Sequence, residues 1–426
     1  MKEMYLQPKS ITALKGYTGK QFVDDLIAGM IVAIIALPLS IALALASGVD
    51  PARGVYTAIF AGFTVSLLGG SRVQIAGPTA AFATVVAGIV ATQGMDGLIL
   101  STVMAGILLV IMGVCKCGNL IKYIPHTITI GFTAGIAVTI FIGQIKDFFG
   151  LTYAAGVAPI ETMEKISANI RAATTCSLPA LLIGAVSLAI LIIYPKFEKR
   201  IPPSLIAVLV GAALVKLIPA LDAGVNTIGE LYTIPAGLPP FALGNIEISV
   251  AKITAALPNA VTIAVLAGIE SLLSCVVADG MIDDRHHSNA ELVAQGVGNI
   301  ASVMFGGIPA TGAIARTAAN IKNGGKTPVA GMVHALVLLL VLVFLMPYAG
   351  LIPMPTIAAI LFMVAFNMSE YKKFANIVKT APKFDVLVMI LTFAFTVIFD
   401  LVVAIAVGMA LVLLSRLIKR LARRAS

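Results

Sequence analysis

The chain of 426 residues has no tryptophan, only four cysteines, and few charged residues, which make up 12% of the sequence. So little charge, with 59% hydrophobic residues, excludes a soluble globular protein. Without tryptophan, an aromatic belt at the membrane interface would rest on the nine tyrosines. The cysteines lack metal-ligand spacing and are expected to be reduced packing residues. No metal motif and no nucleophile–base set is recognisable, so we expect no metal, no cofactor and no enzyme.

Apolar runs of about 20 residues recur along the whole length, as in a chain that crosses the membrane many times. The pattern predicts fourteen segments, near residues 22–47, 54–70, 78–91, 96–114, 124–143, 176–194, 203–219, 254–279, 290–305, 312–322, 327–346, 355–367, 384–399 and 401–416. The third and tenth are too short to span at about 1.5 Å per residue. Each follows an extended stretch, Arg72–Gly77 or Gly307–Thr311, and is predicted to be a half-helix preceded by a short strand.

Positive charge is distributed unequally between the two sets of loops. With the N-terminus in the cytoplasm, 22 of the 29 Lys and Arg residues fall in inside loops, 6 in outside loops and one within the membrane. This asymmetry follows the positive-inside rule and predicts cytoplasmic termini, residues 1–21 and 417–426. The basic tail is expected to bind membrane lipid. The net charge of +9 therefore reports topology and does not indicate a nucleic-acid partner.

The two broken segments carry the strongest functional signal. Gly306–Gly325 contains Pro309 and the single intramembrane cation, Arg316. Gly69–Phe82 lies 237 positions earlier when the paired glycines are aligned, which indicates inverted repeats. An arginine at the bilayer centre costs about 2.5–3.5 kcal/mol and normally faces a cavity.

Helix starts in both broken segments would offer free N–H groups and positive helix ends to one anion. These starts are predicted near residues 79–81 and 313–315. Thr79, Ala80, Ala313 and Ala315 are small, so an ion could approach the backbone closely.

Glu270 lies midway along the eighth segment with no opposite charge nearby in the sequence. An ion pair between Glu270 and Arg316 would compensate both buried charges. One interpretation is a structural ion pair between two helices. The interpretation we favour is that the pair lines the substrate site and couples protonation to transport. An apolar contact would join two helices at a lower free-energy cost than a buried ion pair, so a purely structural role is disfavoured.

The first segment contains Pro38, which removes a backbone donor in mid-span. It is either a simple kink or part of a cavity lining, with Ser40 beside it and Leu39 and Leu43 as an apolar wall.

The remaining polar residues have simpler interpretations. Asp24 and Asp25 are expected to cap the first helix. His286 and His287 are expected in a solvated loop, with a metal site as the alternative. His334 is expected to be a core histidine bonded to a neighbour, with a proton relay as the alternative. Residues 222–245 are expected to form a plain loop.

Several stretches resemble the SulP family of sulfate permeases and related anion transporters. They are DLIAGMIVAIIALPLSIALALASGVDP, GVYTAIFAG, GGSRVQIAGPTAAF, GIESLLSCVVADGM and NAELVAQGVGNIASVMFGGIPATGAIARTAANIKNGGKTPVAG, with similar text at Ile357–Met368. The resemblance covers nearly all of residues 20–416. It implies seven-plus-seven inverted repeats, a core domain (22–115 and 254–346) and a gate domain (120–220 and 355–416).

In this family the anion lies between the first, third, eighth and tenth helices, and the eighth-helix glutamate is associated with proton coupling. Carried over by motif, the resemblance implies substrate-binding positions at Ala36, Leu39, Ser40, Leu43, Thr79, Ala80, Ala315 and Arg316, with Glu270 for the proton. Many relatives have glutamine at the position of Leu39 and serine at that of Ala315, so this site is less polar than usual. The family usually ends in a STAS domain. Here the sequence stops about ten residues after its last predicted helix, as a membrane domain without STAS, either naturally or as part of a longer chain.

We therefore expect a secondary anion transporter of the bacterial inner membrane, a proton-coupled symporter of sulfate or a similar oxyanion that moves its core against its gate. A sodium-coupled bicarbonate transporter is the close alternative. An anion-responsive channel or sensor is more distant, as is a nucleobase permease, because Arg316 suits a hard anion better than a neutral ring. A homodimer is also expected, since relatives are often dimers.

Overall fold

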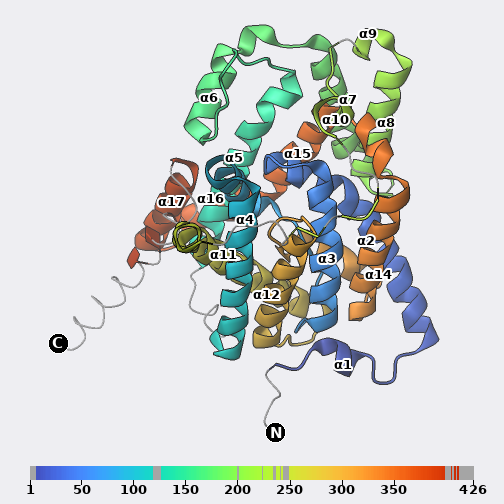
Figure 1. Cartoon of the computed structure of the whole chain (residues 1–426), viewed down its shortest axis with the longest axis vertical. Coiled ribbons are helices and arrows are strands. Elements are labelled where there is room, and N and C mark those ends of the chain that lie inside the picture. The colour runs from blue at the N-terminus through green and yellow to red at the C-terminus, as the bar shows by residue number, and fades with distance from the viewer. Residues whose placement is uncertain are drawn as a thin grey trace, which may run out of the picture.

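The structure is a computed structural model that describes residues 6–118, 126–198, 201–222, 224–233, 237–239, 241–242 and 249–398, with residues 404, 407, 408, 410 and 411 beyond them. It is mostly helical (Figure 1). The elements of the first half are α1 Lys9–Ala13, α2 Gly19–Ala46, α3 Pro51–Leu68, β1 Ala76–Gly77, η1 Ala80–Phe82, α4 Ala83–Val114, α5 His126–Phe149, α6 Thr162–Arg171, η3 Ala173–Thr175, α7 Leu178–Ile193, η4 Tyr194–Lys196, α8 Pro203–Leu217, α9 Pro219–Asp222 and α10 Ile228–Leu231. Those of the second half are α11 Val250–Ile282, α12 Ser288–Met304, β2 Thr311–Gly312, α13 Ile314–Lys322, α14 Pro328–Phe344, η6 Met346–Leu351, α15 Met354–Met368, α16 Tyr371–Thr380 and α17 Lys383–Ile398.

Among the described residues, six helical stretches are long and apolar enough to cross a membrane, and α8 and α14 are shorter apolar helices. Gly94 breaks α4 with φ 69°, a backbone conformation that glycine adopts without strain. The break separates a first half-helix, continuous with η1, from the predicted fourth span. The predicted span 401–416 lies mostly outside the described residues, so the count of fourteen and the inverted repeat remain predictions.

The helices fall into two groups by their contacts. In the first group, α4 packs on α11 and α12, while α14 packs on α2 and α3. In the second group, α5 packs on α15 and α17, and α7 on α8 and α15. Fewer contacts join the groups, and they involve mainly α2 with α8 and α15.

Close helix approach in the first group depends on glycine. A Cβ on Gly54 of α3 would collide with the carbonyl oxygen of Ser40 in α2, and one on Gly296 of α12 would collide with that of Gly106 in α4. Small residues at such crossings let backbones approach closely, which is how membrane helices gain packing energy.

The expected capping role of Asp24 and Asp25 is wrong. Helix α2 begins earlier, at Gly19, where Thr18 and Gln21 form the capping box. Asp25 is fully buried, and its carboxylate accepts hydrogen bonds from the Tyr17 hydroxyl (2.8 Å) and from the N–H groups of Lys326 (2.7 Å) and Thr327 (3.1 Å). It therefore fastens the start of α2 to the start of α14.

Two loop predictions also need correction. The stretch 222–245 contains α10, whose Ile228 N–H donates to the Ile352 carbonyl (2.9 Å), so part of it is ordered against the start of α15. The histidines after α11 have protein partners: His286 Nδ1 lies 2.7 Å from Asp279 Oδ2, and His287 Nδ1 lies 2.9 Å from the carbonyl of the distant residue Gln7.

Candidate anion site

Two short strands bring the broken segments together. β1 and β2 pair antiparallel, with Ala76 opposite Gly312 and Gly77 opposite Thr311, and the Ala313 N–H extends the pairing by donating to the Ile75 carbonyl (2.8 Å). The prediction of short strands before both half-helices is thus confirmed. Because each strand leads directly into a helix, the pairing places the start of η1–α4 beside the start of α13.

Neither helix start is capped by a side chain. In α13 the Thr317 N–H donates to the Ala313 carbonyl (2.8 Å), as the first bond of the helix. The preceding amides, those of residues 314–316, are the orphan donors that a helix N-terminus presents. Ala315 is exposed in this first turn, whereas Thr79 and Ala80 at the other start are buried.

Arg316 lies in the first turn of α13 and is only 2% exposed. Its Nη2 donates to the Pro78 carbonyl, while Nε and Nη1 are buried without a hydrogen-bond partner among the described residues. Buried guanidinium donors that lack an acceptor are costly, which makes this group a strong candidate for binding an anion.

Glu270 approaches the same junction from α11. Its Oε2 accepts a hydrogen bond from the Thr79 hydroxyl (3.0 Å). In the part of the chain that the structure describes, no ion pair joins Glu270 to Arg316, so the structural ion pair considered from the sequence is not formed. The arginine contacts Pro78 and the glutamate contacts Thr79, so the two charged groups bind adjacent residues of the turn after β1.

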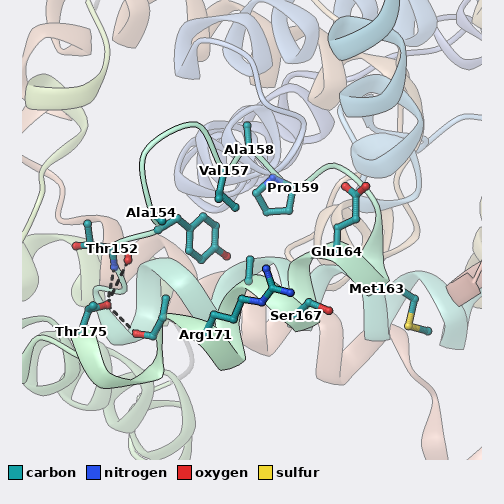
Figure 2. Close-up of a pocket in the computed structure, with 13 residues that line it drawn as sticks. Thr152, Ala154, Val157, Ala158, Pro159, Met163, Glu164, Ser167, Arg171 and Thr175 are labelled. Atoms are coloured by element: carbon teal, nitrogen blue, oxygen red, sulfur yellow. Dashed lines mark hydrogen bonds between the residues drawn. The ribbon is translucent and has the colours of Figure 1, made fainter.

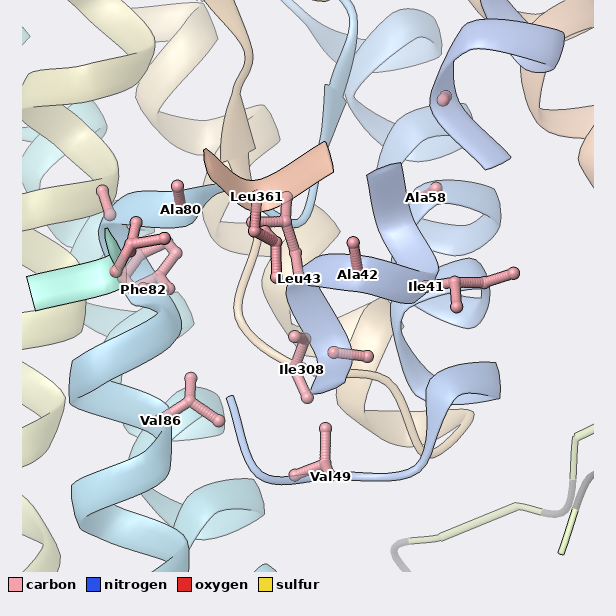
Figure 3. Packing of buried hydrophobic residues seen from close by; sticks show 14 of the residues in the cluster. Ile41, Ala42, Leu43, Val49, Ala58, Ala80, Phe82, Val86, Ile308 and Leu361 are labelled. Atoms are coloured by element: carbon pink, nitrogen blue, oxygen red, sulfur yellow. The ribbon is translucent and has the colours of Figure 1, made fainter. Parts of the chain in front are cut away.

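The predicted residues of α2 lie on one face of that helix, since they are spaced at three and four residues. Ala36, Ser40 and Leu43 are buried, and Leu39 is partly exposed. Ser40 Oγ has no hydrogen-bond partner among the described residues. Helix α2 runs through Pro38 without a break. Leu43 lies in the apolar cluster that contains Leu361 of α15, the contact between the two helix groups (Figure 3).

Polar residues of α12 hold the extended segments in place, and the sequence interpretation missed them. Asn299 exchanges two hydrogen bonds with the backbone of Ala310, both 2.8 Å. Fully buried Glu291 accepts from the Gly70 N–H (2.9 Å), the Gln74 side chain (3.1 Å) and the Gln295 side chain (2.9 Å). Residues 291, 295 and 299 are four apart, and this polar stripe on one face of an apolar helix was the available signal.

Polar groups from α11, α3 and α13 complete this support. Ser271 Oγ lies 2.7 Å from Thr311 Oγ1 and accepts from the Gly312 N–H (3.0 Å). Thr57 Oγ1 accepts from the Ile308 N–H (2.8 Å), and Thr317 Oγ1 accepts from the Ile75 N–H (3.1 Å). Irregular backbone at membrane depth requires such partners, because lipid offers none.

The expected hydrogen bond of His334 is not formed. This residue of α14 is fully buried, and neither ring nitrogen has a partner within the described ranges. A Cβ on Gly62 would lie 3.7 Å from its Nδ1, so the ring faces α3.

A bundle of apolar helices with two helix starts meeting over a buried arginine defines a polytopic membrane transporter, not an enzyme. Residues 22–392 match the sulfate permease family, and the chain belongs to that family. It is 43% identical over 389 residues to YvdB of Bacillus subtilis (strain 168), a proposed sulfate transporter, covering 90% of this chain and 71% of that protein. It is 32% identical over 371 residues to the bicarbonate transporter BicA of a Picosynechococcus species, covering 84% of this chain and 64% of BicA.

Solved structures give the same fold. The transmembrane domain of a cyanobacterial bicarbonate transporter, BicA, superposes with a TM-score of 0.80 at 29% identity, covering 91% of this chain and 98% of that domain. SLC26A9 superposes with a TM-score of 0.88 at 20% identity, covering 97% of this chain and 68% of that one, which supports the fold alone.

Proposed function

We propose that the protein is a secondary active transporter of a small inorganic anion, with proton-coupled sulfate symport as the leading activity. The observation that carries the proposal is Arg316, buried in the first turn of α13 with Nε and Nη1 unpaired among the described residues. Helix-start amides and a buried guanidinium together favour an anion over a cation or a neutral ring.

The anion is proposed to bind between α2, the start of η1–α4, α11 and α13. Arg316 and the backbone at Thr79, Ala80 and Ala315 would supply the donors. Ser40 would add a hydroxyl. The apolar side chains of Ala36, Leu39 and Leu43 would form the wall toward the second helix group.

Transport would follow from movement between the two helix groups, the first acting as core and the second as gate. Few contacts cross between the groups, and the apolar contact of Leu43 with the Leu361 cluster carries no described hydrogen bond that would lock it. Such an apolar boundary can separate and close again without breaking fixed ion pairs.

Uptake of labelled sulfate and bicarbonate into proteoliposomes tests the proposal directly, with proton and sodium gradients imposed separately. Accumulation of sulfate driven by an inward proton gradient is the expected result. Saturation and counterflow would identify a carrier, whereas a passive current would identify a channel.

Sodium-coupled bicarbonate transport is the second candidate, favoured by the similarity to the bicarbonate transporters named BicA. The leucine at position 39 and the alanine at position 315 also leave fewer polar groups for sulfate. Accumulation of bicarbonate with sodium, and no response to protons, would establish this candidate and reject the first.

Glu270 is proposed to couple the proton. A bound anion would weaken the electrostatic effect of Arg316 on the carboxylate, so anion binding and protonation of Glu270 should favour each other by linkage. Glu270→Gln mimics the protonated form and should keep anion exchange while losing stimulation by a proton gradient. Glu291→Gln is the matched control, because that buried carboxylate lies among supporting residues away from Arg316. If Glu270→Gln still concentrates anion under a proton gradient alone, Glu270 is not the coupling group.

A further inference from the structure

A cavity of about 500 Å³ lies between the two helix groups at the end that carries α6. Its walls are the last turn of α2, the half-helix that follows η1, the end of α5 and the segment 153–165. In the predicted topology this end faces outward, so we name this space the outer cavity.

One face of the half-helix leads from the outer cavity to the candidate anion site. Thr84, Ala87 and Ala91 line the cavity at intervals of three or four residues. Ala80 lies one turn before Thr84, and residues at this spacing share a helix face. The face is made of small side chains and ends at the helix start beside Arg316.

The mouth of the cavity carries unpaired positive charge. Lys146 and Lys165 line it together with one acidic residue, Asp147. No carboxylate forms an ion pair with either lysine in the described part of the chain. Lys146 lies over the Tyr153 ring, 5.0 Å from its centroid. Burial lowers the pKa of Lys165 on α6, against a smaller opposing effect of Glu164. Asp147 and Glu164 lie near these lysines but form no described ion pair with them, so a partly desolvated ammonium here still gains from a nearby anion.

The cover of the outer cavity is thin. A second cavity of about 890 Å³ lies on its other side, against α6, with Glu164, Ser167 and Arg171 in its lining (Figure 2). Residues Tyr153, Val157, Ala158 and Pro159 line both cavities. A segment with open space on both faces has few packing contacts to hold it, so it can move aside at low cost.

We propose that the outer cavity is a capture site for the transported anion, in which Lys146 and Lys165 hold a small oxyanion before it moves along the Ala91–Ala87–Thr84 face to Ala80. This inference rests on the proposed function, and it assigns a role to residues outside the site built around Arg316. The captured species is a hydrated anion, such as sulfate or bicarbonate, and selection among anions occurs deeper, at the helix starts.

The test measures uptake into right-side-out membrane vesicles of whichever labelled anion, sulfate or bicarbonate, the wild type accumulates. Because attraction to exposed charge is screened over about 10 Å at 0.1 M salt, Lys146→Met with Lys165→Met should raise KM about 3- to 10-fold at low ionic strength, with Vmax retained and the difference shrinking as salt is added. Lys216→Met is the control, since this exposed lysine lies at the same predicted face outside the cavity lining. A KM equal to wild type in the double variant, or an equal rise in the control, would overturn the capture site.

A substitution on the helix face between the outer cavity and Ala80 tests the proposal independently of charge. Ala87→Phe would fill the narrow face and should slow uptake at saturating anion several-fold, whereas Leu336→Phe on the exposed surface of α14 should not. Unchanged uptake by Ala87→Phe would reject the path. Arg316→Ala separates the two proposals. If Arg316→Ala transports normally, the proposed anion site at Arg316 is rejected. If Arg316→Ala loses transport while the lysine and Ala87 variants behave like the wild type, the site at Arg316 is supported and the capture site is rejected.

Discussion

Arg316 is held so that only part of its hydrogen-bonding capacity is used. Its Nη2 binds the Pro78 carbonyl, which fixes the guanidinium beside the turn after β1, and the other two nitrogens stay without a described partner. A group that one hydrogen bond already holds in place, with further donors unpaired, is preorganised for a ligand, because binding requires little further ordering.

Arg316→Ala should abolish measurable anion binding without unfolding the protein. Each hydrogen bond between charged groups contributes about 1.5–3 kcal/mol, so losing two should weaken affinity by two orders of magnitude or more. Stability should change little, because the substitution also removes a buried charge. Calorimetry with sulfate or bicarbonate gives the affinity, and Lys322→Ala, on the exposed end of the same helix, is the control. Wild-type affinity in Arg316→Ala would remove this residue from the site.

At the scale of elements, α12 acts as a support for the pairing of β1 with β2. Asn299 substitutes for a missing strand by bonding both the N–H and the carbonyl of Ala310, and Glu291 closes the other end through Gly70 and Gln74. The two helix starts can therefore meet only if this helix keeps its polar face toward them.

Asn299→Leu should destabilise the protein and loosen the site together. The buried N–H and carbonyl of Ala310 would lose their partners, at about 1–3 kcal/mol for each unsatisfied group. Thermal unfolding in detergent should show a lower midpoint, and anion affinity should fall with it. Asn367→Leu on the exposed face of α15 is the control. A midpoint and an affinity both equal to wild type would show that the strand pair does not depend on α12.

The short helix α1 docks on the end of α11 through an ion pair. Lys9 Nζ lies 3.1 Å from Asp284 Oδ2, and the Lys9 N–H donates to the Gly69 carbonyl (2.9 Å). Burial tends to raise the pKa of Asp284, but hydrogen bonds from the Arg285 N–H and from Lys9 outweigh it, so the pKa lies below the usual value of 3.8.

A lowered carboxyl pKa stabilises the docked state at pH values above the unfolded pKa, and this contribution is lost as pH falls through the folded pKa. Docking of α1 should therefore be constant from pH 5 upward and weaken below about pH 4. Limited proteolysis with pepsin, with each rate divided by that for an unfolded reference peptide at the same pH, should show relatively faster cleavage near α1 as the pH falls. In Asp284→Asn this pH dependence should disappear. Cleavage independent of pH in the wild type would contradict the prediction.

At the scale of the whole molecule, two helix groups with few shared contacts form the framework. Helices α3, α11 and α12 of the first group pack against the strand pair, and the second group contributes an apolar surface around Leu361. The candidate binding residues thus lie on the first helix group and face an apolar surface on the second. This arrangement suits a carrier in which the first group moves relative to the second.

A homodimer joined weakly through the second group is the prediction at this scale. That group has exposed apolar side chains on α7 and α8, among them Leu182, Val186 and Leu209, which face lipid or a second copy. Native mass spectrometry from mild detergent and from lipid nanodiscs should show dimers that dissociate readily. Monomers alone in both conditions would contradict the prediction.

The sequence by itself determined the membrane class, most helix positions, both short strands and the burial of Arg316, because these follow from apolar periodicity, Gly and Pro breaks and the position of a lone charge within an apolar region. Only the tertiary structure decided how the charges are satisfied. Arg316 and Glu270 bind adjacent residues of one turn and not each other, Asp25 joins two distant helix starts, and His334 has no hydrogen-bond partner in the described part of the chain. Partners far apart in the sequence are chosen by packing, which local composition does not encode. The polar stripe of Glu291, Gln295 and Asn299 could be recognised in the sequence. Its hydrogen-bond partners could not be predicted, because they lie on segments that only the fold brings beside α12.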